Sequence, residues 1–183
     1  MLDQFARGKV NREQFQAVYA HYNSKMESAE VALQRNDPSL IANQPGQTFD
    51  ILQAHMAKPL GFMIYHNRSG LYVDTLGAFD IAPARIAPAL NDFTEWMECS
   101  RQIDPLIERL GEKEWVLFTA GSYTTVISLF HNDPSVTQSQ EIARLHHDFE
   151  VANQHHLAVK RVNASRLGYP FLAFLQEQMG KRA

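Results

Sequence analysis

Two stretches of this chain have the pattern of paired β-strands joined by short polar turns, and they constrain the fold more than any other feature. Residues 58–77, KPLGFMIYHNRSGLYVDTLG, hold two strand patterns around a turn that ends at Gly70. Glycine suits the left-handed position of a short hairpin loop because it has no Cβ. Residues 114–131, EWVLFTAGSYTTVISLFH, hold two aromatic and β-branched runs around Gly121. We therefore expect two antiparallel hairpins.

Helical patterns lie before, between and after these hairpins. We expect a short helix over 49–58 capped by Thr48, a helical region over 83–111 that Pro105 breaks or kinks, and a long helix entered at Asp133-Pro134. A last short helix is expected over 170–179. The predicted fold class is thus α+β, an antiparallel sheet of two or more hairpins packed against helices, with a long N-terminal helix. Only two strands are visible after the middle helical region.

The leading helix has the clearest boundaries. Asn11 is placed to cap it, Gln14 to complete a capping box, and Val10 and Phe15 to form a hydrophobic staple. One apolar stripe then runs along about six turns. Its members are Phe15, Tyr19, Tyr22, Met26, Ala29 and Leu33. The helix should end near Asn36, and either packing on its own domain or contact with a second subunit is open to it.

The chain of 183 residues suits one ordinary core plus an accessory element. We expect a leading helical segment over 1–36, a linker over 37–47, an α+β core over 48–157 and a C-terminal extension over 158–183. A formal net charge of −3 gives no basic field for nucleic acid. No apolar run approaches the length of a membrane span, and the single cysteine fits a reducing compartment. We expect a cytoplasmic protein.

Half of the eight histidines fall in residues 146–156, HHDFEVANQHH. At about 100° per residue, a helix here places one core stripe along Ile142, Leu145, Phe149, Ala152 and His156. His146, Glu150 and Asn153 flank that stripe. Only His146 and Glu150 have the one-turn spacing of metal ligands, so they are the candidate metal residues. Structural or solvated histidines are the favoured interpretation, with a pH-responsive or ligand-contacting role as a further alternative.

The other reactive side chains have simpler interpretations. His66 and His131 each end a predicted strand before a polar turn and are expected on the surface, meeting only if those strand ends are neighbours. Cys99 follows Glu98 in a helix, where nearby acid disfavours the thiolate, so we expect an inert, half-buried thiol. The chain has no GxSxG, Walker loop, GxGxxG or HExxH motif. We predict a protein that is not an enzyme and has no cofactor.

The order of elements over residues 48–157 is similar to the roadblock and profilin-like group, and more loosely to GAF domains. Residues 58–77 look like the first hairpin of a roadblock domain, and 114–131 with the following DPSVTQSQEIARLHHDFEVAN resemble its later strands and closing helix. One departure is visible, since the roadblock pattern has three strands after the middle helix. LDQFARGKVNREQF also looks like small bacterial oligomerisation modules.

The resemblance implies a role, because roadblock domains are mostly regulatory dimers that act on small GTPases or assemble motors and scaffolds. We expect a non-enzymatic regulatory or scaffolding homodimer, with a small GTPase as partner by family analogy only. The leading helix or the apolar C-terminal segment would form the contact, and the candidate interface residues are Phe15, Tyr19, Tyr22, Met26, Phe171 and Phe174. The alternative is a small-ligand or metal sensor, with a pocket between sheet and helices as in GAF domains.

Overall fold

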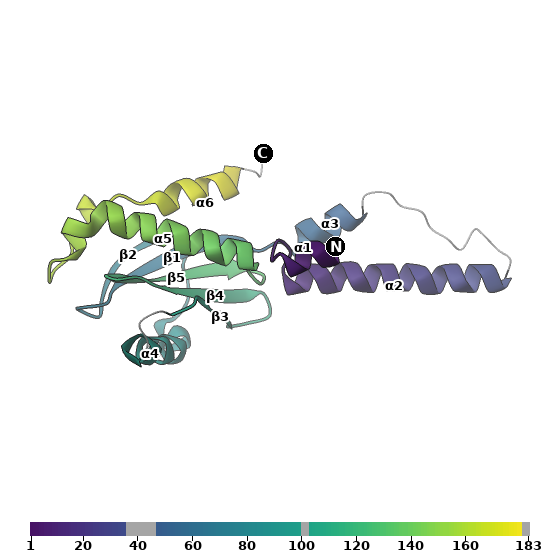
Figure 1. The fold of residues 1–183 in the computed structure, drawn as a ribbon, viewed down its shortest axis with the longest axis horizontal. Coiled ribbons are helices and arrows are strands. Elements are labelled where there is room, and N and C mark those ends of the chain that lie inside the picture. Colours follow the sequence, from purple (N-terminus) through teal and green to yellow (C-terminus); the bar gives the residue numbers. More distant parts are fainter. Residues whose placement is uncertain (36–46, 100–102, 181–183) are drawn as a thin grey trace. The chain divides into compact units, whose positions relative to one another are not determined.

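The computed structural model describes residues 1–35, 47–99 and 103–180, and it has the predicted α+β class (Figure 1). The strands form one five-stranded antiparallel sheet in the order β2-β1-β5-β4-β3. The helices are α1 (Leu2–Ala6), α2 (Arg12–Arg35), α3 (Gln47–Ala54), α4 (Pro83–Cys99), α5 (Val136–Leu157) and α6 (Pro170–Gly180). The strands are β1 (Lys58–His66), β2 (Leu71–Gly77), β3 (Leu106–Arg109), β4 (Glu114–Ala120) and β5 (Thr124–His131).

The chain divides into two compact units, Met1–Met56 and Ala57–Ala183. This division differs from the expected one at both ends of the core. Helix α3 belongs with the leading helices, and the C-terminal segment that carries α6 belongs with the sheet. Residues 36–46, which hold nearly all of the expected linker, lie outside the described residues.

Both predicted hairpins are confirmed. β1 pairs with β2, and Gly70 in their turn has the left-handed φ of 62° that no side chain favours. β4 pairs with β5, and β5 also pairs with β1 at the middle of the sheet. The helix expected at the C-terminus is confirmed as α6.

The helical region expected over 83–111 is wrong over residues 103–111, and residues 100–102 lie outside the described part of the chain. Residues Leu106–Arg109 form β3, a third strand after the middle helix, which pairs antiparallel with β4. Four residues are too few for a visible strand pattern, and their apolar residues continued the helical spacing. The open edge of β4 decides the outcome, because it offers backbone hydrogen bonds that a helix there would leave unpaired.

Two apolar layers cover the two faces of the sheet. Helices α5 and α6 lie on one face and α4 on the other (Figure 1). The α5 layer includes Phe62, Ile64, Leu117, Val126, Phe130, Ile142, Phe149 and Phe171, all with no exposed surface. The α4 layer includes Ile86, Phe93, Val116, Phe118 and Ile127.

Helix α5 differs from its prediction in its start and in its buried face. It begins at Val136, and Ser135, not Asp133, is the N-cap in a capping box with Gln138. The predicted core stripe is wrong at its far end, since Ala152 and His156 are exposed. His146, Glu150 and Asn153 are buried in their place because the sheet unit supplies polar partners for them.

In the leading unit, the predicted capping box of α2 is confirmed. The Gln14 N–H donates to Asn11 Oδ1 at 2.7 Å, and the Asn11 N–H donates to Gln14 Oε1 at 3.0 Å. The same two side chains also bind the segment of α3. Gln14 Nε2 donates to Leu52 O at 2.7 Å, and Asn11 Nδ2 donates to His55 O at 3.0 Å. Thr48, expected as the cap of α3, lies inside it, 2.9 Å from the Tyr22 hydroxyl. Among the described residues, no helix is long and apolar enough to cross a membrane.

Candidate functional site

A buried carboxylate joins α5 to the turn between β4 and β5. Glu150 Oε2 accepts the Ser122 N–H at 2.8 Å, and Oε1 accepts the N–H groups of Tyr123 at 2.8 Å and Thr124 at 2.7 Å. The Thr124 hydroxyl donates to the same Oε1 at 2.8 Å. Charge-assisted bonds of this kind are stronger than bonds between neutral groups. We call Glu150, Thr124, His146 and these three amides the Glu150 cluster.

The hydrogen bonds of Thr124 fix the orientation of His146. Thr124 gives its one hydroxyl proton to Glu150, so its oxygen accepts from His146 Nε2, 2.8 Å away. His146 therefore carries its proton on Nε2, and the donors run from His146 through Thr124 to the carboxylate. Thr124 has no exposed surface, so this row of hydrogen bonds is closed to solvent and holds the turn.

His146 is held in its neutral form. Burial lowers its pKa to about 4, although the nearby Glu150 carboxylate acts in the opposite direction. The two side chains approach to 3.7 Å between Nε2 and Oε1. A neutral imidazole makes this contact polar, not ionic, at neutral pH.

Gly121 allows the carboxylate to reach the turn. A Cβ placed on Gly121 would overlap the carboxylate of Glu150. Asn67 fixes the same turn from the other hairpin by donating to Gly121 O at 2.9 Å and accepting the Thr125 hydroxyl at 2.8 Å. The turn is thus held from α5 and from the β1–β2 loop.

The structure brings together the two candidate metal residues, His146 and Glu150, but occupies them with other partners. Four donors already point at the Glu150 carboxylate, and donors repel a cation. In the described parts of the chain, no group of three or more His, Cys, Asp or Glu residues could hold a metal ion. His147, His155 and His156 are exposed, so they do not converge with His146.

His66 is buried, which corrects its expected place on the surface. Its Nε2 lies 3.0 Å from Leu157 O, and because a carbonyl only accepts, Nε2 carries the proton. Its Nδ1 lies 2.8 Å from Ser69 Oγ. His131 lies at the other end of the sheet, since the register of β1 and β5 pairs His66 with Thr124 and Lys58 with His131. The two histidines therefore do not meet.

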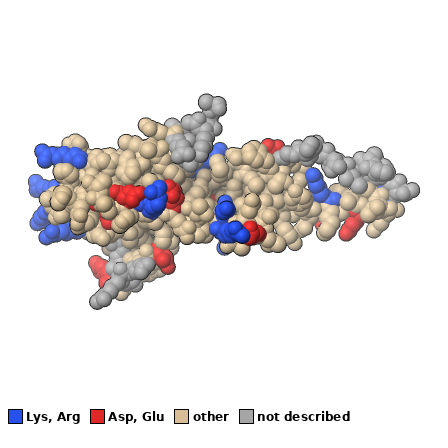
Figure 2. Space-filling view, turned by 45° about the horizontal axis from the view of Figure 1, so that its top comes forward, with Lys and Arg blue, Asp and Glu red and all other residues tan. Residues whose placement is uncertain are grey.

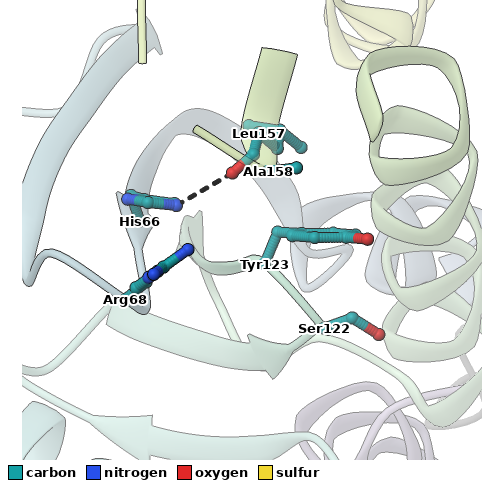
Figure 3. A pocket seen from close by; sticks show the side chains of 6 residues that line it. All are labelled: His66, Arg68, Ser122, Tyr123, Leu157 and Ala158. Atoms are coloured by element: carbon teal, nitrogen blue, oxygen red, sulfur yellow. Dashed lines mark hydrogen bonds between the residues drawn. The ribbon is translucent and has the colours of Figure 1, made fainter. Parts of the chain in front are cut away.

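A pocket of about 330 Å³ lies beside the Glu150 cluster. Its walls come from the β1–β2 loop, the β4–β5 turn and the end of α5, and they consist of His66, Arg68, Ser122, Tyr123, Leu157 and Ala158. Figure 3 shows the Arg68 side chain extending toward the space between His66 and Tyr123. In the described structure Arg68 makes no hydrogen bond or ion pair. A pocket of this size with one free guanidinium fits a small anionic molecule.

The surroundings of the pocket are basic. Lys160 and Arg161 follow its wall residue Ala158 closely, and the stretch from 151 to 176 contains no Asp or Glu. Figure 2 shows basic side chains gathered at this end of the sheet unit. The end of α5 carries partial negative charge, which opposes an anion, but His66 satisfies the Leu157 carbonyl there.

The candidate interface residues divide into exposed and buried groups. Tyr19, Tyr22 and Met26 are 59%, 54% and 59% exposed, whereas Phe15 stacks on Phe5 with 4.6 Å between ring centroids. Phe171 has no exposed surface and packs on Phe62 at 4.9 Å. Its side chain belongs to the core of its own unit, and that excludes it from a surface contact. Phe174 is half-buried in the same layer, 6.4 Å from Phe62.

Cys99 is exposed, not half-buried as expected.

No family model and no curated protein matches this chain. Sequence reasoning selected His146 and Glu150 by spacing but missed Thr124, Asn67 and Arg68. One usable signal was the polar tripeptide Ser122-Tyr123-Thr124, whose amides need partners wherever the turn is buried.

Replacement of His146 by Gln should flatten the acid branch of the stability curve. The neutral native histidine takes up no proton until about pH 4, whereas the unfolded one takes it up below about 6.5. As pH falls from 7.5 to 5, the wild type should thus lose about 2 kcal/mol of unfolding free energy through this residue. Urea unfolding at both pH values measures the loss. His147→Gln, an exposed neighbour, should keep the wild-type slope, and equal slopes in all three proteins would contradict the assignment.

Replacement of Glu150 by Gln should lower the unfolding free energy by about 2–4 kcal/mol, because an amide donor would face the turn N–H groups. Glu141→Gln on the same helix removes only an exposed ion pair with Arg144 and should cost less than about 0.5 kcal/mol. Denaturant unfolding at pH 7 compares the two variants. Similar small losses in both would mean that the cluster does not hold the hairpin.

Proposed function

We propose that this chain is a non-enzymatic regulatory or scaffolding protein that acts through homodimerisation and partner binding. The observation that carries the proposal is the apolar stripe of α2. Four large side chains of this stripe are exposed: Tyr19, Tyr22, Met26 and Leu33, the last of them to 78%. An exposed row of large apolar side chains on one helix face marks a contact surface, since water contact with it is unfavourable.

The fold adds support from a second direction. Three strands follow the middle helix α4, as in the roadblock pattern, whereas only two were visible in the sequence. A small GTPase is therefore the class of partner that we would test first, by analogy alone.

Met26→Lys should shift the protein from dimer to monomer, because it places a charge at the centre of the apolar stripe. Val31→Lys is the matched control, an exposed apolar residue on the opposite side of α2. Light scattering over the micromolar range should give twice the chain mass of 20.8 kDa for the wild type and the control, and a lower mass for Met26→Lys. A wild type that stays monomeric over this range would overturn the proposal.

A second candidate function is sensing of a small organic anion, and the pocket beside Arg68 favours it. The guanidinium would bind the anionic group, while Tyr123 and Leu157 would contact an apolar part. This role is compatible with a regulatory dimer, since a ligand that stabilises one state of a binding surface changes its affinity.

Native mass spectrometry of the purified protein should show a retained small mass that Arg68→Ala reduces at least about tenfold, as expected for loss of a charge-assisted pair. Arg144→Ala is the control, because Arg144 is an exposed arginine of α5 outside the pocket lining. Bare polypeptide for the wild type, or equal retention in all three proteins, would contradict the sensor role.

A further inference from the structure

We propose that α2 pairs in parallel and in register with the α2 of a second copy, as a short two-stranded coiled coil. The inference rests on the homodimerisation proposed above and adds the orientation of the two chains. It begins from spacing. Tyr19, Met26 and Leu33 recur every seven residues, and Phe15, Tyr22 and Ala29 recur every seven residues between them. These are the a and d positions of a heptad repeat, the pattern that joins two helices along one seam.

The described residues of the leading unit leave the side chains of Tyr19, Tyr22, Met26 and Leu33 exposed along this seam. Helix α3 packs on a neighbouring side of α2, where Val18 is buried and Gln14 donates to Leu52 O. Among the described residues, α3 meets the edge of the seam through the hydrogen bond between Thr48 and Tyr22. At the N-terminal end, the stack of Phe5 on Phe15 widens the apolar surface. A second helix therefore has a continuous strip to pack against.

The charges beside the seam select the partner and its direction. With Tyr19 at position a, Lys25 occupies position g and Glu30 the next position e. In a parallel pair, g of one helix lies beside the following e of the other. Each Lys25 would then meet the Glu30 of the second copy, twice by symmetry. Within the described residues neither side chain makes an ion pair or hydrogen bond of its own.

An antiparallel pair loses this complementarity. It brings g beside g, so the two Lys25 side chains would face each other and repel, and Glu30 would lie near uncharged side chains such as Gln16. A surface whose apolar seam and flanking charges complement themselves under a two-fold axis is suited to a second copy of the same chain.

The experiment reverses each charge in turn. Lys25→Glu and Glu30→Lys should each weaken the homodimer by roughly tenfold at low salt, because two attractions become two repulsions. Mixed together, the two variants should form a heterodimer in excess of the statistical mixture, since position 25 of each chain would again face an opposite charge at position 30 of the other. Native mass spectrometry of chains with different tags counts the species. Glu27→Lys, outside the seam, is the control and should pair at random.

A cross-linking arm reads the direction independently of charge. In a Cys99→Ser background, the Leu33→Cys variant should form a disulfide between the two copies of position 33 if the pair is parallel. In an antiparallel pair it should instead link to Phe15→Cys of the other chain. Heterodimer preference with Leu33→Cys self-linking supports the inference. A dimer without preference, linked between 33 and 15, overturns the parallel arrangement and leaves the proposed function standing, whereas a wild-type monomer overturns both.

Discussion

The carboxylate of Glu150 accepts hydrogen bonds from three consecutive backbone N–H groups of the β4–β5 turn. These bonds set the position of α5 on the sheet. A buried carboxylate is costly unless donors surround it, so the helix must rotate until Glu150 reaches the turn. That rotation also buries His146, one turn earlier, against the Thr124 hydroxyl. The apolar residues Ile142 and Phe149 then fill the rest of the interface with no exposed surface. The hydrogen bonds of Glu150 and His146 thus determine which side of α5 faces the sheet, and the apolar side chains of that side pack accordingly.

The same rotation draws the C-terminal segment into the sheet unit. Asn153, the next inward residue of α5, donates to Gly168 O at 2.8 Å and accepts the Gly168 N–H at 2.8 Å. Tyr169 then stacks on Phe149 and donates to Asp74 Oδ2 at 2.7 Å, and burial, with this bond, raises the pKa of its hydroxyl. These bonds position α6 so that Phe171 enters the core. A segment that looked like an apolar extension is therefore part of the domain.

Local signals in the sequence were sufficient for the hairpins, the capping box of α2 and the α+β class, because each depends on residues close together in the chain. Gly70 and the pair Asn11 and Gln14 are examples. The errors occur where distant segments decide. β3 forms because the edge of β4 is open to pairing. The buried side of α5 differs from the predicted one because backbone N–H groups of a hairpin distant in sequence bind Glu150. The spacing of His146 and Glu150 correctly marked two side chains with shared surroundings, but spacing alone could not distinguish a metal ion from backbone donors as their partner.

The two units differ in where their large apolar side chains lie. In the sheet unit, the aromatic rings of Phe62, Phe149 and Phe171 pack against one another inside the core. In the leading unit, Asn11 and Gln14 cap α2 and bind the α3 segment with the same side chains, beside the buried Val18. In the apolar stripe of α2, Phe15 stacks on Phe5, whereas four large side chains stay exposed: Tyr19, Tyr22, Met26 and Leu33. The heptad spacing of these exposed side chains is the basis of the helix pairing that we propose.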